Sequence, residues 1–135
     1  MYQRLTIFIL TSLALAAVLA GCARNPATGD TDLIVMTQGK EVSIGQEMHD
    51  ELIAKGASYD DPELQAYVGR VGQRLVASSD RADLAFTFTV IDSPDINAFA
   101  TPGGFVYINR GLLAYLDNEA ELAGVLSHEI GHVTA

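Results

Sequence analysis

The segment His128-Glu129-Ile130-Gly131-His132 combines residue types that can bind a metal ion and transfer a proton. Two histidines four positions apart share one face of an α-helix, so both imidazoles can bind one Zn²⁺ without bending the helix. Glu129 lies beside the pair, where it can take a proton from a water whose pKa the zinc lowers to about 7. It would then return the proton to a leaving amine. The pattern predicts zinc-dependent hydrolysis of a peptide bond.

The flanking residues indicate that this segment lies on an amphipathic helix. At 100° per residue, Glu121, His128 and His132 fall within about 40° of one another, while Gly124 and Gly131 flank the histidine face and leave room there. The opposite face is apolar and is expected to pack in the core: Leu122, Leu126, Ile130 and Val133. The alternative is a surface helix with two solvated histidines that bind no metal.

Hydrophobic periodicity and turn residues outline the elements that must position this helix. The pattern predicts an α+β fold with N-terminal helices, a small antiparallel sheet with an edge hairpin, and the histidine-bearing helix at the C-terminal end. Gly69 and Gly72 are expected to allow close packing of the second helix, and Pro102 and Gly103 predict a type II turn in the hairpin. The expected elements are helices over 41–55, from Pro62 to Val76, over 111–116 and from Asn118 onward, and strands over 85–91, 96–100 and 105–109.

The N-terminal residues have the pattern of a bacterial lipoprotein signal peptide. Arg4 precedes an apolar run that ends in Leu19-Ala20-Gly21-Cys22, so residues 1–21 are expected to be removed and Cys22 to carry lipid. Residues 22–40 then form a lipidated tether, within which the apolar stretch 33–36 is a candidate short strand. Ala23 follows the cysteine, which favours the periplasmic face of the outer membrane. The alternatives are a transmembrane anchor, for which the run is shorter than about 20 residues, and a cysteine buried in the core.

The net charge of −9 excludes some partners. Nucleic acid binding needs a basic stripe, and the sequence has no cluster of lysine and arginine, so no nucleic acid partner is expected. Attachment to an anionic membrane surface must come from acyl chains on Cys22 rather than from charge. Because Cys22 is the only cysteine, an intramolecular disulfide is also excluded.

Three segments together resemble the zinc peptidases of the HtpX, BepA and LoiP group, which are gluzincin-type membrane quality-control proteases: 97–108, 110–113 and 119–133. The resemblance runs from about Glu41 to Ala135. It implies a zincin-like fold in which His128 and His132 are ligands of one Zn²⁺ and Glu129 is the catalytic base. It also implies that the hairpin segment Asn97-Ala98-Phe99-Ala100 binds a peptide substrate as an added strand, a mode that reads mainly backbone groups. The alternative is a purely structural sheet edge.

A zinc peptidase site needs three protein ligands, and nothing between His132 and Ala135 supplies the third. In the resembling family that ligand is a glutamate on a later helix, so residues 41–135 are expected to be the N-terminal part of a longer peptidase domain. His49 is expected to be solvated rather than a ligand. We therefore expect residues 1–135 alone to bind zinc poorly and to cleave no peptide.

The function that these features predict is a membrane-associated zinc endopeptidase that degrades unfolded, misfolded or misassembled envelope proteins. The alternative is a non-catalytic periplasmic lipoprotein that uses the same scaffold to bind outer-membrane proteins or an assembly partner. The intact histidine motif favours the peptidase, because a binding module has no need of Glu129 between the two histidines.

Overall fold

The chain forms two compact units, Met1–Val35 and Met36–Ala135. The computed structural model describes residues 22–24, 31–33 and 37–134. In the first unit, β1 (Cys22–Arg24) pairs antiparallel with β2 (Thr31–Leu33). The predicted signal peptide and residues 34–36 of the predicted apolar strand lie outside the described residues. None of the helices in the described parts of the chain combines the length and the apolar character needed to cross a membrane.

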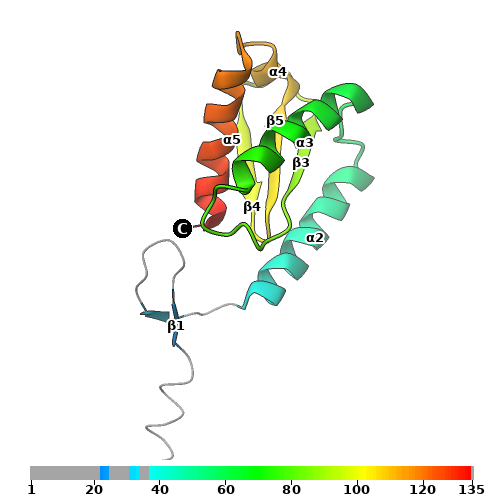
Figure 1. Cartoon of the computed structure of the whole chain (residues 1–135). Coiled ribbons are helices and arrows are strands. Elements are labelled where there is room, and N and C mark those ends of the chain that lie inside the picture. The colour runs from blue at the N-terminus through cyan, green and yellow to red at the C-terminus, as the bar shows by residue number, and fades with distance from the viewer. Residues whose placement is uncertain (1–21, 25–30, 34–36, 135) are drawn as a thin grey trace, which may run out of the picture. The chain divides into compact units, whose positions relative to one another are not determined.

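The second unit has the predicted α+β composition, with helices on both faces of one three-stranded sheet (Figure 1). Its elements are α2 (Gln38–Ala54), α3 (Pro62–Val76), β3 (Thr87–Ile91), β4 (Ala98–Thr101), β5 (Phe105–Asn109), α4 (Arg110–Leu113) and α5 (Glu119–Thr134).

Local capping explains where the first two helices begin and end. α2 begins three residues earlier than predicted because Thr37 caps it, accepting the backbone N–H of Lys40 at 3.4 Å. Gly56 follows this helix with a φ of +73°, the left-handed conformation in which a glycine commonly ends a helix. α3 begins at Pro62 as predicted, and the Asp61 side chain accepts a backbone N–H of its first turn.

The strand order is β3-β5-β4, which corrects the prediction of an antiparallel sheet. β4 and β5 form the predicted antiparallel hairpin, but β5 lies between the other two strands and runs parallel to β3. The sheet is therefore mixed. The physical reason is burial, because every residue of β5 is buried and the most apolar strand takes the centre.

The turn of the hairpin has the predicted conformation. Gly103 follows Pro102 with a φ of +81°, as the third position of a type II turn requires. A side chain at Gly103 would also collide with α2, because its Cβ would lie 2.6 Å from the Cα of Val42. Another close approach occurs at Gly45 of α2, which faces the carbonyl of Pro102. The turn and the first half of α2 are thus in direct backbone contact.

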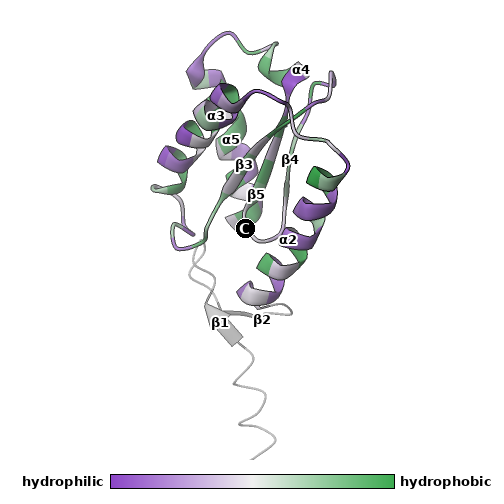
Figure 2. Ribbon diagram, turned by 90° about the vertical axis from the view of Figure 1, so that its right-hand side faces the viewer, coloured by the Kyte–Doolittle hydropathy of each residue, from purple (hydrophilic) through white to green (hydrophobic). Residues whose placement is uncertain are grey.

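The two faces of the sheet bury different side chains, since successive residues of a strand point to opposite faces. Tyr107 and Phe105 point to the α2 face, whereas Val106 and Ile108 point to the face covered by α3 and α5. Figure 2 shows α2 and α3 on opposite sides of the strands. The larger core cluster lies between the sheet and α3 and α5: Val68, Val71, Val76, Leu84, Phe86, Val90, Val106, Ile108, Leu122, Leu126 and Ile130.

The two glycines of α3 differ in their surroundings. A Cβ on Gly72 would lie 2.4 Å from a ring carbon of Phe88, so this glycine allows the close packing that the sequence predicted. A Cβ on Gly69 would meet nothing within 4 Å, so the same prediction is wrong for Gly69.

The two alanine substitutions should therefore change stability in opposite directions. Gly69→Ala should raise the free energy of unfolding by roughly 0.5–1 kcal/mol, because it removes the flexibility of a mid-helix glycine without a clash. Gly72→Ala should lower it by about 1–3 kcal/mol, because the Phe88 ring must move. Urea unfolding of the two variants beside the wild type checks this, and a destabilised Gly69→Ala or a stabilised Gly72→Ala would contradict it.

Candidate active site

The start of α5 is held by side-chain caps. Asn118 Oδ1 accepts the backbone N–H groups of Ala120 and Glu121 at 2.9 and 3.1 Å. The Glu121 carboxylate accepts the backbone N–H of Asp117 at 2.8 Å, one residue before the position used in a capping box. The helix therefore begins at a defined residue, which sets the rotation of every later side chain about its axis.

α5 buries the apolar side that the sequence predicted. Leu122, Leu126 and Ile130 are buried in the larger core cluster, while Val133 is only half-buried at its margin. The helix packs against α3 and against β4, beside which it lies in Figure 1. Burial of three apolar side chains fixes the helix on the sheet and leaves its other side to solvent.

The two histidines of α5 are exposed and close together. The Nε2 atoms of His128 and His132 are 3.0 Å apart, and the ring planes are at 85°. Two nitrogens bound tetrahedrally to one zinc at about 2.0–2.1 Å would be roughly 3.3 Å apart, so the pair fits a shared ion with a small adjustment. Side chains at Gly124 or Gly131 would meet nothing within 4 Å, which confirms the predicted open space beside the histidines.

Glu129 follows His128 in α5, but its side chain is nearly buried, with an exposed fraction of only 8%. Among the described residues, no hydrogen bond to its carboxylate is present, and only Thr101 Oγ1 is both enclosed and unpartnered there. The carboxylate of Glu129 therefore keeps some contact with solvent. A carboxylate that is nearly buried and has no fixed partner is free to accept a proton from a water next to it.

No third metal-binding side chain joins the histidine pair within the described residues. His49 does not approach it, because His49 lies on the α2 face of the sheet. Its Nδ1 is 3.1 Å from the hydroxyl of Tyr107, and its ring stacks on Phe105 at 5.1 Å. The prediction that His49 is solvated is therefore wrong, and the reason is that α2 turns this side chain toward the central strand.

A half-buried ion pair ties the end of α5 to α2. Arg81 Nη1 lies 3.2 Å from a carboxylate oxygen of Glu41 and 3.4 Å from the carbonyl oxygen of Val133, next to His132. A cation near the last carbonyls of a helix interacts favourably with the helix dipole. Sequence reasoning missed this contact, since its partners are 40 and 52 residues from Arg81 and carry no local signal.

The predicted substrate-binding segment lies at one edge of the sheet. Asn97 is exposed, and Ala98, Phe99 and Ala100 are half-buried. Among residues 37–134, no strand other than β5 pairs with β4. The outer edge of the sheet at β4 is thus accessible in the part of the chain that is described.

The opposite edge of the sheet, at β3, is covered by the chain itself. The backbone N–H of Tyr59 donates to the Val90 carbonyl at 2.9 Å, and Ser58 forms a bridge with Ile91. The Gln65 side chain binds both the N–H and the carbonyl of Val90, at 2.8 and 3.0 Å. These contacts occupy the backbone groups of β3 with which an added strand would pair. Of the two edges, only the β4 edge therefore has backbone groups available for an added strand.

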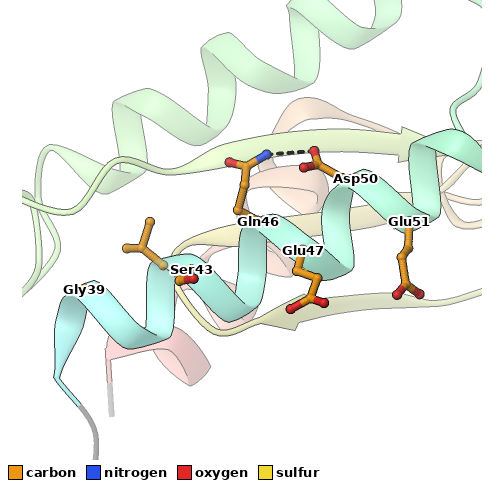
Figure 3. Close-up of a pocket in the computed structure, with 7 residues that line it drawn as sticks. Gly39, Ser43, Gln46, Glu47, Asp50 and Glu51 are labelled. Carbon is orange, nitrogen blue, oxygen red and sulfur yellow. Dashed lines mark hydrogen bonds between the residues drawn. The ribbon is translucent and has the colours of Figure 1, made fainter.

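A shallow hollow on the outer side of α2 is a separate feature. Its lining includes Ser43, Gln46, Glu47 and Asp50, and the Gln46 amide donates to Asp50 at 2.9 Å (Figure 3). All of its lining residues come from α2, and none comes from α5. This hollow therefore has no part in the chemistry of the histidine pair.

Comparison with known proteins defines the class to which this arrangement belongs. Residues 62–135 match the model of Peptidase family M48. The matched residues include α3, the sheet and the histidine-bearing helix. The match covers more than half of the chain, so the chain belongs to Peptidase family M48.

Individual relatives carry peptidase names. The chain is 40% identical over 102 residues to the beta-barrel assembly-enhancing protease of Escherichia coli, covering 71% of the chain and 21% of that protein. It is 37% identical over 136 residues to the Yersinia pestis protein of the same name, covering 93% of the chain and 28% of the relative. It is 44% identical over 69 residues to the mitochondrial metalloendopeptidase OMA1 of Schizosaccharomyces pombe, covering 51% of the chain and 20% of that protein. The matches thus span about a fifth to just over a quarter of the length of these relatives.

The Tyr107 hydroxyl should make stability depend on alkaline pH. Burial raises the pKa of Tyr107 above its usual value of 10.0, so the unfolded chain releases this proton at a lower pH than the folded protein. The folded state then binds more protons, and the free energy of unfolding falls as the pH rises above about 10. Tyr107→Phe removes the hydrogen bond to His49, so its free energy of unfolding at neutral pH should be about 1 kcal/mol lower than that of the wild type. Between about pH 9 and pH 11, however, its free energy of unfolding should fall less steeply. Urea unfolding at a series of pH values measures both effects, and parallel pH profiles would contradict the assignment.

Proposed function

We propose that the protein containing this chain is a zinc-dependent endopeptidase that degrades unfolded or misassembled proteins at the periplasmic face of the outer membrane. The observation that carries the proposal is the exposed pair of His128 and His132, whose Nε2 atoms are 3.0 Å apart on a helix packed against an accessible sheet edge. Membership of a peptidase family supports it.

The histidine pair would hold the metal. Both side chains are exposed on one face of α5, and neutral imidazole is a common zinc ligand. The third ligand is proposed to come from residues beyond Ala135. When bound, the zinc would act as a Lewis acid and supply a strongly nucleophilic water at neutral pH.

Glu129 is the proposed catalytic base. Two observations support this role: Glu129 directly follows His128 in α5, and its near burial restricts the movement of the side chain. It would take the proton of the attacking water and deliver it to the leaving nitrogen of the peptide bond.

The β4 edge is the proposed substrate platform. A peptide added to this edge would lie beside α5, because α5 packs against β4. Backbone pairing tolerates many sequences, as a protease for misfolded proteins requires. Such a substrate must be extended and unpaired, which selects unfolded segments over folded ones.

The membrane attachment is proposed to be covalent. The chain is acidic, with a net charge of −9, so electrostatic binding to anionic lipid is unfavourable. Lipid on Cys22 would provide the anchor, since two or more acyl chains make attachment stable.

Substitutions in the histidine motif test the peptidase function on the full-length protein. Glu129→Gln should lower kcat for an unfolded protein substrate by at least about 10²-fold while zinc stays bound, because the base is lost and the ligands are kept. His132→Ala should lose both the zinc and the activity. Casein hydrolysis and metal analysis by mass spectrometry are the measurements.

Glu47→Gln is the matched control, because Glu47 is an exposed glutamate on the outer side of α2. It should keep the activity and the zinc of the wild type. If purified wild type binds zinc and unfolded proteins but cleaves none, the non-catalytic binding protein replaces the peptidase as the explanation. Equal activity in Glu129→Gln would remove Glu129 from the mechanism.

Cys22→Ser tests the lipid anchor. Wild type extracted from membranes should begin at Cys22 and carry the added mass of acyl chains, in the outer-membrane fraction. The variant should keep residues 1–21 without lipid and leave that fraction, because the thiol is the acceptor. Intact-mass spectrometry after density-gradient separation provides the measurement, and an unlipidated wild type that still starts at Met1 would contradict the proposal.

A further inference from the structure

The hydrogen-bond pattern of the hairpin shows which backbone groups of β4 face outward. The backbone N–H of Asn109 donates to the carbonyl of Asn97 at 3.0 Å, so these two residues form a hydrogen-bonded pair. Such pairs alternate with non-hydrogen-bonded pairs along an antiparallel ladder. In the observed register, Phe99 opposite Tyr107 is therefore the next hydrogen-bonded pair. The N–H and carbonyl groups of Ala98 and Ala100 point away from β5, toward the accessible edge.

These groups decide which positions of an antiparallel peptide can exchange hydrogen bonds with β4. Ala98 and Ala100 exchange hydrogen bonds with the peptide, and the peptide residue opposite Phe99 is in a non-hydrogen-bonded position. In an antiparallel pair this position has the shortest Cα–Cα distance, about 4.5 Å, so the two side chains are in close contact. That peptide residue and Phe99 point to the same face of the sheet.

The two faces of β4 offer different surfaces to the peptide. On the α2 face, Phe99 is half-buried and its ring stacks on the fully buried Tyr107, with centroids 4.8 Å apart and planes at 20°. The hydrogen bond between Tyr107 and His49 holds that second ring in place. On the α5 face, β4 presents only the methyl groups of Ala98 and Ala100. One face is an aromatic surface, and the other carries only small β4 side chains beside the histidine-bearing helix.

We propose that Phe99 is a specificity residue that selects extended peptides with an aromatic or β-branched side chain at the position opposite it. The inference rests on the proposed peptidase function and names the substrate class for that site. The peptide residues on either side of this position point toward α5, where only small β4 side chains compete for space. The selected side chain thus sets the register of the peptide and, with it, the bond that is presented to His128 and His132.

The test uses the full-length protein and a set of peptides that share one flexible, polar sequence of serine, glutamine and glycine. A single phenylalanine is moved along this sequence one residue at a time, and the cleaved bond is identified by mass spectrometry. The cleavage position should move with the phenylalanine at a constant offset. Replacing the phenylalanine with serine should lower kcat/KM by about fivefold, the upper range for an aromatic cross-strand pair.

Variants of the enzyme assign the effect to Phe99. In Phe99→Ala, the cleavage site should no longer keep a constant offset from the phenylalanine, and kcat/KM should be the same for phenylalanine and serine peptides. Phe99→Tyr should keep both the offset and the difference in kcat/KM. Ile96→Ala is the matched control, because Ile96 is a 63% exposed apolar residue just before β4. It should behave as wild type.

The outcomes separate this inference from the function on which it rests. If wild type cleaves all the peptides equally, with cleavage sites independent of the phenylalanine, the specificity role of Phe99 is overturned and the peptidase function stands. If Phe99→Ala keeps the wild-type offset, another residue selects the register and the inference fails. If wild type with bound zinc cleaves neither peptides nor casein, both proposals fail together.

Discussion

The packing of α5 on the sheet is the interaction on which the candidate site depends. Leu122, Leu126 and Ile130 enter the larger core cluster, and an α-helix that buries one side must present the other to solvent. With this rotation set, His128 and His132 are exposed, and Glu129 is nearly buried. The same packing that stabilises the domain therefore decides which side chains of the motif are exposed and which one stays close to the protein interior.

The order of the strands decides which edge lies beside that helix. Because β5 occupies the centre, the hairpin leaves β4 at the edge next to α5 and β3 at the opposite edge. Contacts from Tyr59 and Gln65 cover the β3 edge. The accessible edge and the histidine pair are thus neighbours through topology, although nearly thirty residues separate them in the sequence.

Two further contacts hold this arrangement from the outside. α2 approaches the hairpin turn through Gly45 and fastens the central strand through the bond between His49 and Tyr107. Arg81 joins Glu41 of the same helix to the last turn of α5. A helix with few buried residues of its own therefore supports both the hairpin and the histidine-bearing helix. This arrangement limits the independent movement of the two, as a site with geometric requirements needs.

Local chemistry in the sequence determined much of the fold and the identity of the site residues. The limits of α3, the hairpin with Gly103, and the amphipathic histidine-bearing helix all follow from capping, turn conformation and periodicity over a few residues. Tertiary structure alone decided the parallel pairing of β3 with β5, the covered edge, the contact of His49 with Tyr107 and the contact of Arg81 with Val133. Each of these joins residues distant in sequence, and a single chain's pattern records which side of an element is buried but not which element will bury it.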